Sequence, residues 1–324
     1  MPSKTFVLGA GFSADAGFPL VRTLRTDVIS WIETERHPSA KPHLTPYLHG
    51  YPEGQFYAGL KSIDPSGSMG FEELTIAARD RLSATYLHDP AYTFDRILRD
   101  ACGRLLWHKQ KALNLPAPIA YQNFASWFHE HHLYGQTNAI ISFNWDLLAE
   151  TVLADSKAGW SYTIESPWVP ILKPHGSINW SSHMEQSLHA PGWKPIAPGS
   201  TYCHIPDAPF SDPFENGANQ RLRKLILPGD PEDSGGAALI WKEAESAIRE
   251  RDTIVFIGYS LPGYDAFSTK FFQRVSTGKQ IEVYTRSIGT LEHYKRMLGN
   301  IASTAPVPFA HSPYAKPFLQ AASA

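Results

Sequence analysis

The chain has 324 residues, a formal net charge of −2, an apolar fraction of 43% and a charged fraction of 19%. This balance is typical of a folded globular protein and argues against a disordered chain. The near-neutral charge gives no overall basic character of the kind that favours nucleic acid binding. No apolar run reaches the roughly 18 residues that a membrane-spanning helix needs, so we expect a cytoplasmic protein that binds neither nucleic acid nor a membrane.

The spacing of cysteine and histidine residues argues against a metal site. The two cysteines, Cys102 and Cys203, lie far apart in the sequence, whereas structural zinc usually takes four ligands, often in Cys-x-x-Cys pairs. The run from His129 to His132 lacks the i and i+4 histidines of a helical zinc-protease site, because position 133 is leucine. We interpret this run as a solvated helix end, and we expect no metal and no zinc module.

The first part of the chain predicts one strand followed by several helices. Residues 5–10 form a short, continuously apolar strand, and residues 20–35 have helical spacing. Residues 37–70 show no clear period, and we interpret them as a long irregular connection, either a lid or a plain surface loop. Three helices are then expected at about 71–87, 91–113 and 118–132.

The second part alternates strands with helices, a pattern that predicts a parallel sheet. Strands are expected at 139–143, 170–173, 225–228, 253–257 and 280–284, and helices at 145–155, 237–251 and 266–275. Residues 181–222 are rich in Gly, Pro, Ser and Asn and are predicted to loop out of the sheet. The simplest architecture is a single α/β domain over residues 1–324. It is a doubly wound, Rossmann-like parallel sheet with a helical insertion at about 35–135.

A glycine turn follows the first predicted strand. Gly9 and Gly11 allow backbone angles and close approaches that suit a bound pyrophosphate, and Gly9-x-Gly11-x-x-Ala14 satisfies the loose dinucleotide pattern. A tight strand-to-helix turn would explain the same residues. An ordinary dehydrogenase also needs an acidic residue at the end of a second strand, whereas Asp27 falls inside the predicted helix. The turn therefore favours a phosphate site over a Rossmann oxidoreductase.

Polar residues follow four further strands, of which two are considered first. Asn144 and Asp146 come after residues 139–143, where they could bind a ligand or simply cap the next helix, and for this pair alone capping is favoured. His175 lies between Pro174 and Gly176, where an imidazole could remove a proton near neutral pH or merely hydrogen-bond to a loop backbone.

Two later strand ends complete the set. Gly258, Tyr259 and Ser260 follow the strand at 253–257, and Asp265 is placed to cap the helix that begins at 266. Thr285 and Arg286 end the last strand, although an arginine at such a position is more often a surface residue than a ligand.

Taken in order, these clusters resemble the sirtuin family. The run from Gly9 to Pro19 is similar to the sirtuin NAD-binding opening, Ser142–Asp146 to the Thr-Gln-Asn-x-Asp run, and His175-Gly-Ser to the catalytic His-Gly. Gly258–Ser260 falls at the later ribose-phosphate segment. The chain departs from protein-deacylating sirtuins on the peptide side. Of Asp-Phe-Arg it keeps only Arg22, it lacks the four-cysteine zinc module, and it carries Leu225–Asp230 in place of the Phe-Gly-Glu clamp.

The pattern most resembles the prokaryotic sirtuin-like NAD hydrolases of antiphage defence. The sequence motifs of that group are matched here by Ser142–Asp146, His175–Trp180 and Gly258–Pro262. The resemblance implies an NAD⁺ glycohydrolase that uses NAD as a substrate and needs no metal. Its alternatives are a protein deacylase and a non-catalytic NAD or ADP-ribose sensor.

The resemblance also implies residue roles and partners. Asn144 would position the attacking water or ribose hydroxyl, His175 would act as general base, and Asp146 would bind the nicotinamide carboxamide. The remaining NAD contacts are expected from Gly9, Ala10, Gly11, Phe12, Ser13, Pro19, Arg22, Gly258, Tyr259, Ser260, Thr285 and Arg286. A homo-oligomer, or a partner protein of the ATPase or sensor type encoded alongside, is expected to release such an enzyme from an inactive state.

Overall fold

The computed structural model describes residues 3–35, 53–83, 90–113, 117–133, 137–156, 159–165, 167–182, 193–194, 203–204, 222–225, 235–299 and 301–317. The chain divides into two compact units, which we describe separately. Unit 1 consists of residues 1–18, 110–175 and 237–324, and unit 2 of residues 19–109 and 176–236. The helices expected as one insertion over 35–135 are therefore shared between the two units.

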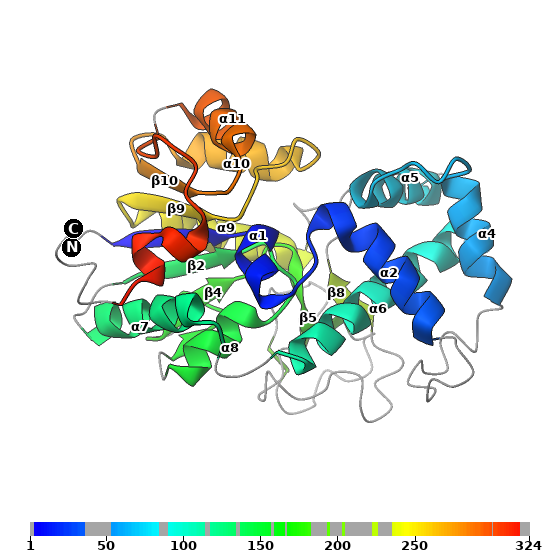
Figure 1. Ribbon diagram of the computed structural model, residues 1–324, viewed down its shortest axis with the longest axis horizontal. Coiled ribbons are helices and arrows are strands. Elements are labelled where there is room, and N and C mark those ends of the chain that lie inside the picture. The colour runs from blue at the N-terminus through cyan, green and yellow to red at the C-terminus, as the bar shows by residue number, and fades with distance from the viewer. Residues whose placement is uncertain are drawn as a thin grey trace. The chain divides into compact units, whose positions relative to one another are not determined.

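Unit 1 is built on a six-stranded sheet in which every strand pair is parallel (Figure 1). The spatial order is β10 (Gln280–Tyr284), β9 (Thr253–Ile257), β1 (Lys4–Leu8), β2 (Ala139–Ser142), β4 (Val169–Leu172) and β3 (Trp160–Ser161). From β1 the chain proceeds to β2 on one side, whereas β9 is followed by β10 on the other. The strand order therefore reverses between β1 and β9, which confirms the predicted doubly wound sheet. In such sheets, ligands bind beyond the carboxyl ends of the strands at this reversal.

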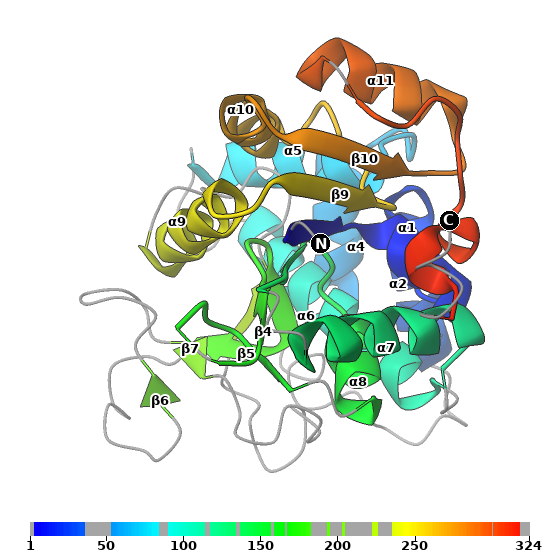
Figure 2. The ribbon, with the colours of Figure 1, turned by 90° about the vertical axis from the view of Figure 1, so that its left-hand side faces the viewer.

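Helices cover both faces of this sheet (Figure 2). On one face, the Thr5 hydroxyl donates to the Ala247 carbonyl of α9 (Gly235–Arg249) at 3.0 Å, and Phe256 packs on Phe272 of α10 (Ala266–Val275). On the other face, Phe6 packs against aromatic side chains of α7 (Ile119–Leu133) and against Tyr314 in the turn η5 (Pro313–Ala315). The continuously apolar strands are thus buried on both sides, as their sequences predict.

Five further elements lie in the described part of unit 1. They are α1 (Ala10–Ser13), η1 (Ala14–Ala16), α8 (Leu148–Asp155), α11 (Ile288–Leu298) and η4 (Phe309–His311). The expected bounds of α10, β9 and β10 are confirmed residue for residue, whereas α11 and β3 were not predicted. No helix among the described ranges is long and apolar enough to cross a membrane.

The described residues of unit 2 form four helices and a small antiparallel sheet. The helices are α2 (Val21–Glu35), α4 (Glu53–Ile63), α5 (Phe71–Ser83) and α6 (Pro90–Lys111), the last of which extends into unit 1. The sheet has the order β6 (Trp193–Lys194), β7 (Cys203–His204), β5 (Gly176–Ser182) and β8 (Leu222–Leu225). An ion pair of 3.0 Å between Arg25 and Asp64 links α2 to the end of α4.

Three expectations for these regions are corrected. Residues 37–70 are not wholly irregular, because α4 lies within them; the two glycines of Glu53–Ile63 weaken the helical signal there. The stretch predicted to loop out from 181 contributes strands to the second sheet, although most of it lies outside the described residues. The strand expected at 225–228 lies at Leu222–Leu225, and residues 226–228 are outside the described part.

The interpretation of His129–His132 as a solvated helix end is wrong for His131. This side chain is buried, its ring stacks on Trp127 with 3.7 Å between centroids, and its Nδ1 lies 2.7 Å from the Trp127 carbonyl oxygen. Burial lowers the pKa of His131 below its ordinary value, because the apolar surroundings disfavour the charged ring.

His131 should therefore make stability depend on pH. As pH falls through about 6.5, the ordinary histidine pKa, the unfolded chain takes up a proton that the buried ring resists. The free energy of unfolding should thus fall between about pH 7 and pH 5, and His131→Gln should reduce this slope. Urea denaturation at a series of pH values measures this pH dependence, and His311→Gln, which replaces an exposed histidine, is the control. Equal slopes in wild type and His131→Gln would contradict the prediction.

Candidate functional site

The glycine turn after β1 rests directly on the loop after β9. The Gly9 amide donates to the Ile257 carbonyl at 3.1 Å, and the Gly11 amide donates to the Gly258 carbonyl at 2.9 Å. A Cβ added to Gly9 would lie 2.5 Å from Tyr259 Cα, so no larger residue fits there. The Phe12 amide also donates, to the Gly9 carbonyl at 2.8 Å. The close contact between loops thus explains both glycines without a ligand. Pyrophosphate binding by Ala10–Ser13 stays a prediction.

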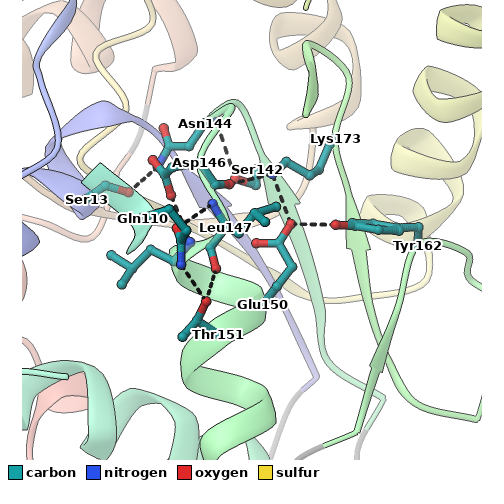
Figure 3. A network of polar contacts seen from close by, with 11 residues as sticks. Ser13, Gln110, Ser142, Asn144, Asp146, Leu147, Glu150, Thr151, Tyr162 and Lys173 are labelled. Carbon is teal, nitrogen blue, oxygen red and sulfur yellow. Dashed lines mark hydrogen bonds and ion pairs between the residues drawn. The ribbon is translucent and has the colours of Figure 1, made fainter. Parts of the chain in front are cut away.

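Asn144 joins this turn to the end of β2 (Figure 3). Its Nδ2 donates to the Gly9 carbonyl at 3.0 Å and to the Ser13 hydroxyl at 2.9 Å, and the residue is buried. These two bonds use both Nδ2 hydrogens, which fixes the orientation of the amide and leaves Oδ1 as its acceptor atom. The interpretation of Asn144 as a helix cap is therefore wrong.

Asp146 does hold the start of α8, as the capping interpretation predicts. Its Oδ1 accepts from the Leu148 amide at 3.0 Å. Burial raises the pKa of the Asp146 carboxyl, against the opposing effects of the Lys173 ammonium, the Leu148 amide and a hydrogen bond from Ser13. The carboxyl therefore belongs to the same buried network as Asn144 and Ser13.

A buried ion pair supports this network from β4, and the sequence analysis did not single it out. Lys173 Nζ lies 2.9 Å from Glu150 Oε1 and donates to the Asp146 carbonyl at 2.6 Å (Figure 3). The Tyr162 hydroxyl donates to the same Glu150 oxygen at 3.1 Å. The two charged side chains are 0% and 1% exposed. The sequence did contain an indication of this ion pair: Lys173 directly follows a continuously apolar strand, and a charge buried at such a position requires a partner.

His175 follows β4 and brings the third cluster to the site. Its ring packs edge-on against Phe143 with 4.8 Å between centroids, and its carbonyl accepts from the Trp145 indole at 3.0 Å. Phe143 in turn stacks on Tyr259 at 4.4 Å. His175 Nε2 lies 3.6 Å from Asp265 Oδ2, and its side chain is 18% exposed. The predicted residues after β2, β4 and β9 therefore lie together.

The remaining predicted residues have other surroundings. Arg286 forms an ion pair with Asp15 in η1, and the Thr285 hydroxyl accepts from the Ser287 amide at 3.2 Å. Ser260 is exposed in the loop after β9. Pro19 and Arg22 belong to unit 2. Among the residues that the structure describes, no group of three or more His, Cys, Asp or Glu is arranged to hold a metal ion.

Comparison with known proteins gives only distant likenesses. No family model matches the chain, and no curated protein matches its sequence. Among solved structures, an NAD complex of a Sir2 homologue is 15% identical, with 88% of this chain and 78% of that chain covered at a TM-score of 0.36. A mutant Sir2 homologue in complex with 2′-O-acetyl ADP ribose is 15% identical, with 92% and 94% covered and a TM-score of 0.37. At these scores the likeness carries no argument about the site.

Proposed function

We propose that the chain is an NAD⁺ glycohydrolase that cleaves the bond between nicotinamide and ribose. The observation that supports this proposal is the meeting of Asn144, His175 and the glycine turn beyond the carboxyl ends of β1, β2 and β4. These are the residues of the sirtuin-like motifs, and they lie where a doubly wound sheet binds its ligand.

The reaction requires a positioned nucleophile and a proton acceptor. The bond from ribose C1′ to nicotinamide breaks, a water oxygen bonds to C1′, and the water proton leaves, which gives nicotinamide and ADP-ribose. Asn144 Oδ1 would accept a hydrogen bond from the water or from a ribose hydroxyl. His175 would take the proton, directly or through that hydroxyl. Holding these groups in place lowers the entropic part of the barrier.

The other predicted residues would bind the rest of the substrate. On this proposal the turn from Ala10 to Ser13 holds the pyrophosphate, Asp146 the carboxamide, and Gly258–Ser260 with Thr285 the ribose and phosphate groups. Arg286 would exchange its Asp15 partner for a phosphate oxygen, because a guanidinium binds both kinds of anion in the same geometry.

Incubation of the purified full-length protein with NAD⁺, followed by chromatographic separation of the products, tests the proposal. We expect nicotinamide and an ADP-ribose product in equal amounts. A parallel reaction with an acetyl-lysine peptide identifies a deacylase by release of O-acetyl-ADP-ribose that depends on the peptide. Tight NAD⁺ binding without nicotinamide release would identify a sensor instead.

The same proposal includes regulation. An unregulated hydrolase would drain the NAD pool of its own host, so we propose an effector of antiphage defence that assembly or a partner protein activates. Turnover per protomer should therefore rise with protein concentration or on addition of the partner. Full activity at the lowest concentration, together with harmless expression of the wild type, would contradict this part alone.

A further inference from the structure

Asp265 has two oxygens with separate contacts. Its Oδ1 accepts from the Ser268 amide at 2.9 Å, which confirms the predicted cap of α10. Its Oδ2 accepts from the Tyr259 hydroxyl at 3.0 Å and lies 3.6 Å from His175 Nε2. A helix cap needs only the first contact. The second oxygen is therefore directed to the candidate site for a reason other than capping.

The loop that carries Asp265 is held in an unfavourable backbone conformation. Gly258 has a φ of 62°, and Leu261, a buried residue with a side chain, has a φ of 50°. Two side chains of α11 fix this conformation: the Tyr294 hydroxyl donates to the Tyr259 carbonyl, and His293 Nε2 contacts the Leu261 carbonyl, each at 2.9 Å. Strain of this kind persists where surrounding contacts impose it, and it gathers at functional sites. The cap of α11 by Ser287, in contrast, uses ordinary extended backbone.

The charged groups around His175 come from several elements. Asp265, at the start of α10, lies within ion-pair distance. Tyr259, after β9, contacts the same carboxylate, and burial raises the pKa of its hydroxyl well above the ordinary value, so Tyr259 remains a neutral donor. Lys173, the residue directly after β4, is paired with Glu150. Among the described residues, Asp265 is an anionic group within ion-pair distance of this ring, where it can balance a proton on it.

We propose that Asp265 is a positioning residue for His175: its Oδ2 orients the imidazole and balances the positive charge that forms when the ring accepts a proton. The expected effect on catalysis rests on the proposed function, whereas the expected effect on the protonation of His175 does not. The 3.6 Å separation is an ion-pair distance, and contacts of this kind often shorten only when the substrate is bound. Asp265 itself need not touch the substrate.

The test is Asp265→Asn, because asparagine keeps the shape and the oxygen that caps α10 while it removes the charge. NMR of histidine-labelled protein follows the His175 titration, with His175→Gln to assign the signal. The midpoint should lie about one pH unit lower in Asp265→Asn than in wild type, since a nearby carboxylate favours the protonated ring. Glu245→Gln removes an equivalent charge that is paired with two arginines of α9 and α10, and it should leave the midpoint unchanged.

Kinetics supply a second readout. In Asp265→Asn the acid limb of the kcat/KM profile should move to lower pH by the same interval, and kcat should fall about 10- to 100-fold, as for other groups that orient a functional imidazole. If Asp265→Asn melts far below wild type, Asp265→Ser keeps a capping oxygen and replaces it in both measurements. An unchanged His175 midpoint in a folded variant would overturn the inference. A shifted midpoint in a protein that releases no nicotinamide would support the electrostatic relation and count against the proposed activity.

Discussion

Replacement of His175 by alanine should reduce nicotinamide release from NAD⁺ by about 10²- to 10⁴-fold, the usual contribution of a general base. The protein should stay folded, because the ring is partly exposed and packs at the edge of Phe143 rather than inside the sheet. Initial rates from chromatography, with circular dichroism and thermal melting for the fold, measure both expectations. A loop histidine without a chemical role would leave the rate within a few-fold of wild type.

Asn144→Ala should cause a loss of similar size for a different reason. It removes the oriented Oδ1 and the two bonds that join β2 to the glycine turn. Asn123→Ala is the matched control, because Asn123 also donates from Nδ2 to a distant carbonyl, that of Ala315 at 2.8 Å, but lies in α7. Asn123→Ala should lose about 1 kcal/mol of stability and Asn144→Ala about 2 kcal/mol, because one hydrogen bond is lost in the first variant and two in the second. Normal turnover by Asn144→Ala would count against its role in the reaction.

Lys173→Met should lower the free energy of unfolding by about 3–5 kcal/mol, because it leaves the Glu150 carboxylate buried without its cation. Both side chains are almost fully inaccessible to solvent, so neither can be hydrated in place. In the double variant Lys173→Met/Glu150→Leu, most of this loss should be recovered, since no charge remains buried. Urea denaturation of the single and double variants measures the coupling.

The Lys4–Glu282 pair provides the matched control. Its ions lie 2.8 Å apart, as close as those of Lys173 and Glu150, but the side chains are 17% and 15% exposed. Lys4→Met should therefore cost only about 1 kcal/mol, as expected for a pair near solvent. If Lys173→Met and Lys4→Met lowered the stability equally, burial would not be the factor that makes the first pair important.

Several elements could be predicted because the residues that specify them are neighbours in the sequence. Strand β9 is a short apolar run, β10 alternates apolar residues with Gln280 and Glu282, and α10 begins at a capping aspartate three residues before the amide that it accepts from. The glycine turn, the polar residues after β2 and the histidine after β4 also stand out, since each follows a buried strand. For the parallel order of the sheet, alternation of strands and helices was sufficient evidence.

The contacts that give these residues their roles could not be predicted, because they join positions far apart in the chain. Local sequence favoured capping of α8 for the pair Asn144 and Asp146. The bonds of Asn144 to a turn 131 and 135 residues away exist only because β1 and β2 are neighbours. The Lys173–Glu150 pair and the approach of Asp265 to His175 likewise depend on which helix packs beside which strand end. Hydrogen bonds and ion pairs act over a few ångströms, so the packing of the elements determines which polar groups meet.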